Sequence, residues 1–405
     1  MKRIYLDHNA ATPVRTEVKN AMVPLLTDNF GNASSVHHFG QAAQHALEDA
    51  REKLARLINA EESTEIVFTS GGTESDNLAI IGAAESLKNK GNHIITSSIE
   101  HHAVLNSCAY LHKHRGCTIT YLPCDQYGRV SPADLQRAIT NKTILASIIM
   151  ANNEVGTIQP IEELARICKE KNIVFHTDAV QAGGKLPINM QKLSVDMLSL
   201  SAHKFYGPKG TGMLYIKKGI HLVPLLHGGH HERNRRAGTE NIAGIVGMAK
   251  ALELSAEDML SEENRIRTLR DKLQKNLMQK IPYAKLNGHP EHRLSNTLNI
   301  SFEFIEGEGI ILSMDIKGLA VSTGSACTSG TLEPSHVLKA MGVPIEAAHG
   351  SIRFSLGRSN SASDIDYVIK TMPGIIEKLR SISPLWEDKQ KGVETAYTED
   401  SNTHH

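Results

Sequence analysis

Short apolar runs alternate with amphipathic segments from about residue 65 to residue 217, and this alternation constrains the fold more than any other feature. It predicts strand–helix–strand units that build a mostly parallel sheet with helices on both faces. The seven expected strands are residues 65–70, 93–98, 118–123, 143–151, 173–179, 196–202 and 211–217. Binding sites of such sheets lie at the carboxyl ends of the strands, so the residues that follow each run are the candidates for function.

A second, smaller unit is expected after the sheet. Residues 240–280 predict one long amphipathic helix that bridges to it. The segments expected beyond that helix are strands at 297–303 and 351–356 and helices at 308–317 and 361–383.

The chain is therefore predicted to be an α/β protein with two domains, a division that its 405 residues allow. A large domain with the seven-stranded sheet between helices spans 16–259. A smaller α+β domain combines 1–15 with 260–405, and its polar end from about 386 to 405 is expected to be a mobile tail.

The charge balance and hydropathy exclude several kinds of partner. Lysine plus arginine and aspartate plus glutamate both number 44, so no net charge attracts nucleic acid or an anionic membrane. No run of about 18 apolar residues occurs, and the N-terminus reaches acidic and turn residues before it could form an apolar signal core. We expect a cytoplasmic protein with no direct nucleic-acid or membrane contact.

The five cysteines differ in their surroundings. An odd count without a Cys-x-x-Cys pair argues against a disulfide framework and against a zinc site. Cys108, Cys124 and Cys168 lie among apolar neighbours and are expected to be inert. Cys327 lies in a stretch of small and hydroxyl residues at 322–334, where an exposed thiol on a mobile loop could carry a group away from a substrate. An incidental surface cysteine is the alternative.

A candidate phosphate site follows the first strand of the sheet. That strand runs into Gly71, Gly72 and Thr73, and an amphipathic helix begins there. Glycines let the backbone curl around an anion, and the helix N-terminus offers unpaired amides and a positive dipole to it. An ordinary turn without a ligand is the alternative.

Two later strands end in residues that suit an aldehyde cofactor. Asp178 closes one strand with Gln181 just behind it, and Lys204 follows another strand together with Ser201 and His203. The lysine can form a Schiff base, and the carboxylate can keep a pyridine nitrogen protonated. Gln181 could hydrogen-bond the phenolic oxygen of the ring, and the other two could donate to its phosphate. A solvated lysine and a helix-capping aspartate are the alternative for each residue taken singly.

Further candidates surround this pair. His101 follows the second strand and could stack on a cofactor ring and move protons, unless it only begins a helix. Asn153 could donate to the ring or substrate or simply cap a helix, and Arg353 could bind a carboxylate or form a surface ion pair. The loop 227–241 is rich in histidine and arginine and matches no standard metal-ligand spacing, so we expect a solvated, mobile loop. Its Thr239 could reach a phosphate.

With these residues assembled, the chain resembles the cysteine desulfurases of the NifS and IscS type, within the class V aminotransferase group of fold type I pyridoxal 5'-phosphate (PLP) enzymes. The resemblance runs from the start to about residue 390. Its matching stretches are YLDHNAATPV, FGNASSVHHFG, FTSGGTESDN, EHHAV, ANNEVGTIQP, HTDAVQ, SAHKFYGPKGTG, RAGTEN, GSACTSGTLEPSHVLKAMG and HGSIRFSLGR. So many motifs in the right order are very unlikely to match by chance.

The resemblance implies the role of each candidate in a PLP enzyme that converts L-cysteine to L-alanine. It implies that Lys204 binds the cofactor covalently, that Asp178 contacts the pyridine nitrogen and that His101 stacks on the ring. Cys327 would accept the sulfur as a persulfide and would touch an iron–sulfur cluster only transiently; no metal site is implied. The remaining implied contacts are Gln181 to the phenolic oxygen, Gly72, Thr73, Ser201 and His203 to the phosphate, Thr239 to the phosphate from the partner subunit of a homodimer, and Asn153 and Arg353 to the substrate carboxylate.

The resemblance also bears on partners. The long loop around Cys327 resembles that of the group I enzymes, which hand sulfur directly to an iron–sulfur scaffold protein and to other acceptors such as a transfer-RNA thiolation relay. Two departures stand out: Gly72 replaces a common alanine, and the apolar residues usual near the C-terminus are replaced by TEDSNT. The rival interpretations are a selenocysteine lyase or aminotransferase built on the same lysine, and a non-catalytic subunit that carries sulfur.

Overall fold

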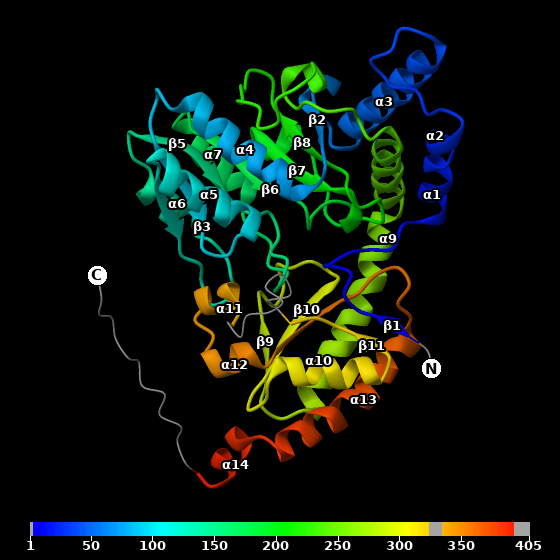
Figure 1. Cartoon of the computed structure of the whole chain (residues 1–405). Coiled ribbons are helices and arrows are strands. Elements are labelled where there is room, and N and C mark those ends of the chain that lie inside the picture. The colour runs from blue at the N-terminus through cyan, green and yellow to red at the C-terminus, as the bar shows by residue number, and fades with distance from the viewer. Residues whose placement is uncertain (1–2, 324–333, 393–405) are drawn as a thin grey trace.

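The computed structural model describes residues 3–323 and 334–392, and its centre is one seven-stranded sheet (Figure 1). The strands are β2 (Ile66–Thr69), β3 (His93–Ser97), β4 (Thr118–Leu122), β5 (Thr143–Ser147), β6 (Val174–Asp178), β7 (Met197–Ser201) and β8 (Gly212–Ile216). They lie in the order β2-β8-β7-β6-β5-β3-β4, and only β8 runs antiparallel to its two neighbours. The predicted α/β fold with a mostly parallel sheet is confirmed.

Both faces of this sheet are buried except at its edge strand β4, which explains why the other strands lack a solvent-exposed polar face. Alternate residues point to opposite sides of a strand, so Val67 and Ile94 contribute to one apolar cluster while Phe68 and Ile95 contribute to the other. Helices α4 (Gly72–Leu87) and α5 (His102–Arg115) cover the first face. The opposite face is covered by α3 (His38–Leu57), α6 (Pro132–Ala138), α7 (Ile161–Glu170) and α8 (Met190–Leu193).

The long helix α9 (Ile242–Lys280) connects the two parts of the molecule, as the sequence predicted. The side chain of Asn241 accepts a hydrogen bond from the Gly244 amide and caps its first turn. One part of α9 packs against α1 (Thr16–Met22), α2 (Pro24–Thr27) and α3, and another packs against the segments that follow it. Figure 1 shows it descending from the sheet into the lower part of the molecule.

The lower part has an apolar cluster of its own. The antiparallel sheet β12-β10-β9 and the parallel pair β1-β11 pack there against α9, α10 and α13. The bounds are β1 (Ile4–Tyr5), β9 (Ala284–Asn287), β10 (Thr297–Phe302), α10 (Gly307–Ile316), β11 (Leu319–Ala320), β12 (Ser351–Ser355) and α13 (Ala362–Ser381). Val337 and Leu338 of α11 (His336–Ala340), with Ala348 of α12 (Ile345–His349), belong instead to the cluster under the large sheet.

The prediction of a mobile tail from residue 386 is wrong for its first residues. Helix α14 (Pro384–Gln390) begins with a proline at its first position, where a missing amide costs nothing. The Trp386 ring lies 5.7 Å from the ring of Tyr283 and 5.5 Å from that of Phe304, and the Arg380 guanidinium stacks on it at 5.0 Å. One aromatic anchor therefore orders a segment whose composition is otherwise polar. The rest of the predicted tail, 393–405, lies outside the described residues. Among the described helices, none is both long enough and apolar enough to span a lipid bilayer.

Candidate active site

The predicted site residues come together because β2, β3, β6 and β7 all point the same way. Parallel strands place their carboxyl ends at one edge of the sheet. Gly71 follows β2, His101 follows β3 after a short turn, Asp178 ends β6, and Lys204 closes a 3-10 turn directly after β7. Four segments that are far apart in the sequence thus meet at this edge.

The turn after β2 has the backbone of an anion cradle. Gly71 precedes α4 with φ of +153°, a conformation that a side chain would strain. A Cβ built on Gly71 would lie 3.7 Å from the Ser201 hydroxyl oxygen, so the turn faces β7 closely. Ser201 shares a 2.9 Å hydrogen bond with Nδ1 of His203. The Thr73 side chain is exposed in the first turn of α4, where the helix amides are unpaired.

A buried carboxylate and a lysine stand beside this cradle. Asp178 is only 3% exposed, and its Oδ1 accepts a 2.9 Å hydrogen bond from the Val180 amide. Burial raises the pKa of the Asp178 carboxyl to about 6, against the opposing effect of the positive Lys204. Nζ of Lys204 donates to the main-chain oxygens of Asn9, at 2.6 Å, and Ala10, at 2.9 Å.

A second buried acid lies behind Asp178. Burial, followed by the charge of Asp178, raises the pKa of Asp76 well above its usual value. Its Oδ1 lies 3.7 Å from Nε2 of His176, and burial lowers the pKa of that imidazole to about 3. His176 is therefore neutral, and burial beside Asp178 disfavours the charged form of Asp76.

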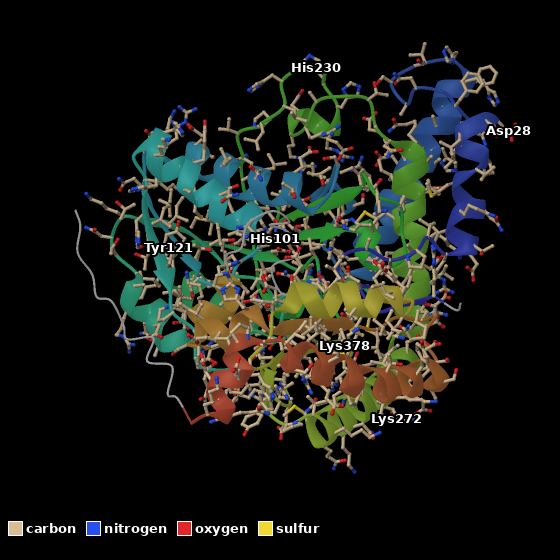
Figure 2. The ribbon with its side chains drawn as sticks, turned by 60° about the horizontal axis from the view of Figure 1, so that its bottom comes forward. Asp28, His101, Tyr121, His230, Lys272 and Lys378 are labelled. Carbon is tan, nitrogen blue, oxygen red and sulfur yellow. The ribbon has the colours of Figure 1, made fainter. Side chains whose placement is uncertain are left out.

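His101 lies near the middle of the molecule in Figure 2. It caps the N-terminus of α5, as the alternative interpretation of the sequence, a histidine that begins a helix, expected. Its Nδ1 accepts a 3.1 Å hydrogen bond from the Ala103 amide, so the neutral ring carries its proton on Nε2. Burial, then the charges of Lys204 and His102, lower the pKa of His101 to about 4. The same side chain lines a hollow together with Thr73 and thus also faces the anion cradle.

Asn153 and Arg353 are in direct contact. Nη1 of Arg353 donates to the Asn153 main-chain oxygen at 3.1 Å, and Nη2 forms a 2.8 Å ion pair with Asp7. Arg353 is 3% exposed, so the surface ion pair that sequence reasoning kept as an alternative is instead a buried one. Its Nε is buried without a hydrogen-bond partner among the described residues.

Asn9 connects these groups, and sequence reasoning assigned it no role. Its main-chain oxygen accepts from Nζ of Lys204 and from Nε2 of Gln181 at 2.9 Å. Its side-chain amide nitrogen donates to the Asn153 oxygen at 3.1 Å, and its side-chain oxygen accepts from Asn296 at 2.9 Å. The only signal in the sequence was that Asn9 lies in the matching stretch YLDHNAATPV, where polar residues follow Tyr5 and Leu6.

The expectation of a solvated, mobile loop at 227–241 is wrong for its centre. Glu232 is 5% exposed, and its carboxylate accepts from both terminal nitrogens of Arg51, at 2.6 and 2.8 Å, and from the Phe68 amide at 2.9 Å. Composition could not reveal this anchor because Arg51 lies 181 residues away. Thr239 lies further along the loop with an exposed side chain. No cluster of three potential metal ligands occurs in the described parts of the chain.

Cys327 falls in 324–333, outside the described residues, but the residues that follow this segment are placed. The Ser335 hydroxyl donates to Glu154 at 2.5 Å, and His336 shares a 2.9 Å hydrogen bond with the Glu100 main-chain oxygen. The rings of His336 and His102 lie 4.7 Å apart. The chain therefore leaves the segment beside the turn that carries His101. Of the three cysteines expected to be inert, Cys108 and Cys168 are buried and Cys124 is half-buried.

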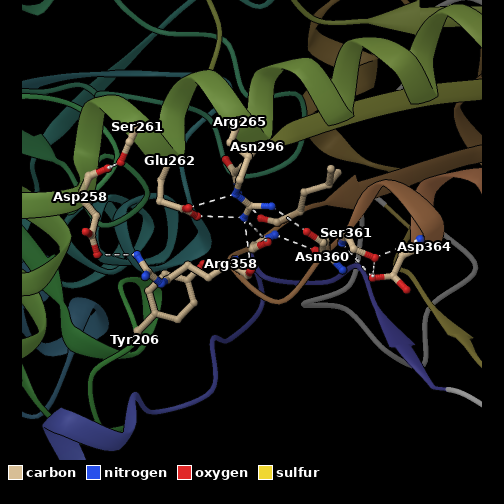
Figure 3. A network of polar contacts seen from close by, with 12 residues as sticks. Tyr206, Asp258, Ser261, Glu262, Arg265, Asn296, Arg358, Asn360, Ser361 and Asp364 are labelled. Carbon is tan, nitrogen blue, oxygen red and sulfur yellow. Dashed lines mark hydrogen bonds and ion pairs between the residues drawn. The ribbon is translucent and has the colours of Figure 1, made fainter.

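A polar network surrounds Arg265 and Arg358 (Figure 3). The Tyr206 hydroxyl accepts from the Arg358 amide at 3.0 Å, and Arg358 pairs with Asp258 of α9 at 2.7 Å. Arg265 lies two helical turns further along α9 and donates to the Asn360 main-chain oxygen at 2.7 Å. The network ties α9 to the loop between β12 and α13, and Tyr206, Asp258 and Arg358 line the same cavity as Lys204.

These residues fit PLP. The cofactor needs an anion cradle for its phosphate, a lysine for its aldehyde and a carboxylate for its pyridine nitrogen. The glycine turn before α4, Lys204 and the buried Asp178 supply these three groups at one edge of the sheet. The fold and the site together define a PLP-dependent enzyme of fold type I.

The chain belongs to the aminotransferase class-V family, whose model matches residues 4–368. It is 56% identical over 384 residues to cysteine desulfurase IscS of Methanosarcina thermophila, covering 95% of this chain and 94% of the relative. Cysteine desulfurase IscS of Dictyoglomus turgidum is 56% identical over 385 residues, with 95% and 97% covered. A solved NifS-like protein superimposes with a TM-score of 0.88 at 40% identity, covering 93% of this chain and 100% of that one. The family is PLP-dependent, so the predicted family and cofactor are confirmed.

Proposed function

We propose that this protein is a cysteine desulfurase that converts L-cysteine to L-alanine and takes the sulfur onto Cys327 as a persulfide. The observation that carries the proposal is the meeting of Lys204, Asp178 and His101 at one sheet edge. The sulfur is destined for iron–sulfur cluster assembly, with transfer-RNA thiolation as a second destination. Relatives that are named cysteine desulfurases match nearly the whole chain and support this assignment.

The cofactor would be held by the residues that line the edge. Lys204 would bind its aldehyde, Asp178 its pyridine nitrogen and Gln181 its phenolic oxygen. The residues proposed for its phosphate are Gly72, Thr73, Ser201, His203 and, from the partner subunit, Thr239. When bound, PLP supplies an electron sink that weakens the bonds to the substrate's Cα and stabilises negative charge on the carbon skeleton. The raised pKa of the neighbouring Asp76 disfavours a second carboxylate charge there, and the carboxylate of Asp178 would favour a protonated pyridine nitrogen.

Asn153 and Arg353 would orient the substrate by its carboxylate. A guanidinium presents several donors in one plane and binds carboxylates in two-point contacts. The buried Nε of Arg353 has no hydrogen-bond partner in the part of the chain that the structure describes, while the ion pair with Asp7 fixes the other end of the group. This arrangement supports a preorganised anion site of the size of one carboxylate.

His101 and Lys204 would handle protons. Nζ of Lys204 would take the proton from the substrate's Cα. Because Nδ1 of His101 accepts from a main-chain amide, Nε2–H is the donor of the neutral ring, and from it His101 would hold a thiolate by hydrogen bonding. Its pKa of about 4 keeps the ring neutral across the physiological range.

The sulfur transfer would be a nucleophilic displacement. The thiolate of Cys327 attacks the substrate's sulfur, an S–S bond forms, and the bond between Cβ and sulfur breaks. The electron pair of the broken bond leaves with the carbon skeleton, which takes up a proton to give alanine. The enzyme keeps the sulfur as Cys327–S–SH, so neither an external oxidant nor a reductant is needed in this half of the cycle.

We further propose a cytoplasmic homodimer that passes sulfur to an iron–sulfur scaffold protein. Exposed apolar side chains gather in the N-terminal region, where Val36 is 89% exposed and the exposed rings of Phe30 and Phe39 stack at 5.6 Å. Such a patch on the surface suits burial against a second copy. The exposed Thr239 is consistent with a contact across that interface.

The domain division belongs to the same proposal. A large PLP-binding domain would span 16–259, and a small domain would combine 1–15 with 260–405. The separate apolar cluster that holds Ile4, Leu6 and the C-terminal half of α9 supports this division.

The decisive experiment follows alanine and sulfide together from purified holoenzyme with L-cysteine and a thiol reductant. We expect equal amounts of both products from the unaltered enzyme and loss of both in Cys327→Ala. Cys124→Ala serves as the matched control, because burial raises the pKa of that thiol to about 11 and makes it a poor nucleophile. Full turnover in Cys327→Ala, or sulfide without alanine, would refute the assigned chemistry.

A further inference from the structure

We propose that Lys185 is a positioning residue that locks the side-chain amide of Gln181 in one of its two orientations. The inference rests on the proposed function, in which Gln181 donates to the phenolic oxygen of PLP. Lys185 then acts on the cofactor only through Gln181. Neither the matching motifs nor the site built above gives Lys185 a role.

The contacts form a short chain from Lys185 to the site. Nζ of Lys185 donates to the main-chain oxygen of Gln181 at 3.0 Å and lies 3.3 Å from its side-chain Oε1. At the other end of the amide, Nε2 of Gln181 donates to the Asn9 oxygen at 2.9 Å. The same Asn9 oxygen accepts from Nζ of Lys204 at 2.6 Å.

This arrangement leaves the amide no second orientation. The Asn9 main-chain carbonyl only accepts hydrogens at any pH, and the Lys185 amine offers hydrogens in both its charged and its neutral form. With Lys185 on one side and the Asn9 carbonyl on the other, Oε1 must face the lysine and the NH₂ group must face Asn9. A flip would bring NH₂ against the lysine and oxygen against oxygen. The amide hydrogens of Gln181 are thereby directed towards the side where Lys204 lies.

The backbone is built to bring Lys185 to this place. Gly184 precedes it with φ of +68°, and a Cβ there would lie 2.7 Å from Cβ of Phe205 and 3.0 Å from Cβ of Ser255. Only glycine permits this close turn, which carries the lysine under the segment of Lys204. Both lysines line the same interdomain cavity.

A purely structural role for Lys185 is the weaker explanation. Burial, then the charge of Lys204, lowers the pKa of the Lys185 ammonium to about 7. No ion pair of Lys185 is found among residues 3–323 and 334–392, where its hydrogen-bond partners are the two oxygens of Gln181. A long apolar side chain would fill the same volume without the cost of desolvating an amine. What the lysine adds is a set of donors that face one amide.

The test is a double-mutant cycle read by absorption of the bound cofactor. Holoenzyme is titrated with pH in the absence of cysteine, and the apparent pKa of the visible band is compared for Lys185→Met in two backgrounds, unaltered and Gln181→Ala. We expect a shift of at least about half a pH unit in the unaltered background and almost none in Gln181→Ala. Asp178, His101 and His203 stay in place in all four proteins and cancel from the cycle.

A charge control separates positioning from electrostatics. Lys209→Met removes an exposed cation whose charge, like that of Lys185, lowers the pKa of His203. Lys209 lies outside the hydrogen-bond chain from Lys185 to Asn9. We expect equal shifts for Lys209→Met in both backgrounds. Equal shifts for Lys185→Met in both backgrounds, or no shift in either, would overturn the proposal. Lys185→Leu enters the same cycle where Lys185→Met does not fold.

This readout does not depend on desulfuration. The absorption titration needs bound PLP but no turnover of cysteine. A protein that binds PLP without releasing sulfide would refute the proposed function and would still give the cycle a result. Conversely, normal sulfide release with equal shifts in both backgrounds would refute only the role of Lys185.

Discussion

Replacing Glu232 by alanine should lower the free energy of unfolding by about 3 to 5 kcal/mol, the usual cost of removing one partner of a buried ion pair. The side chains of Glu232 and Arg51 are each 2% exposed, and the pair is held by two hydrogen bonds of 2.6 and 2.8 Å. Arg51 would keep Glu48 at 3.3 Å, but that carboxylate is 32% exposed and compensates poorly. The Phe68 amide would lose its acceptor as well.

The conservative substitution Glu232→Gln divides this cost. Glutamine retains the shape and one acceptor but removes the charge, so we expect a loss of about 1.5 to 3 kcal/mol. The loop would also loosen, because Glu232, Arg233 and Asn234 have φ of 44°, 54° and 63°, which non-glycine residues adopt only under constraint. We therefore expect PLP to dissociate faster from Glu232→Ala, since this loop carries Thr239 and Glu232 also holds the Phe68 amide of β2, the strand that leads into the glycine turn.

Urea denaturation of the holoenzyme, followed by far-ultraviolet circular dichroism, measures the stability. Glu170→Ala is the matched control, because its pair with Arg166 is more than 60% exposed on both sides and spans one helical turn. We expect that control to stay within about 0.5 kcal/mol of the unaltered protein. A Glu232→Ala protein that loses less than about 1 kcal/mol, or no more than Glu170→Ala, would refute the claim that this pair anchors the loop.

Two further predictions concern the site and its border. A Cβ at residue 72 would lie 2.8 Å from Cγ2 of Val180, so Gly72→Ala should lower the free energy of unfolding by about 1 to 3 kcal/mol in urea denaturation. Adding Val180→Ala should restore most of this loss. A Gly72→Ala protein as stable as the unaltered one would contradict this packing. Burial raises the pKa of Glu154 to about 7, so its contribution to stability is fully present below about pH 4.5 and is lost as the pH rises through 7. Glu154→Gln cannot ionise, and its stability relative to the unaltered protein should rise by about 2 kcal/mol from pH 5 to pH 8; a difference independent of pH would show that this carboxyl ionises freely in the folded state.

The sheet and the positions of its strands could be predicted because their signal is local. The strands of the large sheet other than the edge strand β4 are buried on both faces, so an apolar run marks each of them wherever it stands in the chain. Ends were less certain. The run 143–151 suggested a strand four residues longer than β5, which ends at Ser147. Beyond it, the amides of Ile148 and Met150 still bond to β6, but the pairing with β3 has stopped.

The residues that support the site could not be predicted, because their partners lie far away in the sequence. Asn9 is 195 residues from Lys204, and Glu232 is 181 residues from Arg51. No local period or spacing encodes such contacts. Lys185 follows two glycines in a stretch that reads as an ordinary turn, and only the fold shows that its amine lies against Gln181. Sequence motifs marked the groups proposed to touch the cofactor, but even where a motif contained a supporting residue, as with Asn9, its role did not follow from the motif.

The N-terminal segment explains why the two parts of the molecule should assemble the site together. Ile4 and Leu6 are buried in the lower apolar cluster, and Asn9, three residues further on, contacts Lys204 and Gln181 of the large sheet. Asp7, between them, pairs with Arg353 of the lower sheet. The segment is too short to satisfy one set of contacts while the other is broken, since three residues span at most about 11 Å. The lysine, the amide that faces the cofactor and the guanidinium proposed for the substrate are therefore set in register by one stretch of main chain.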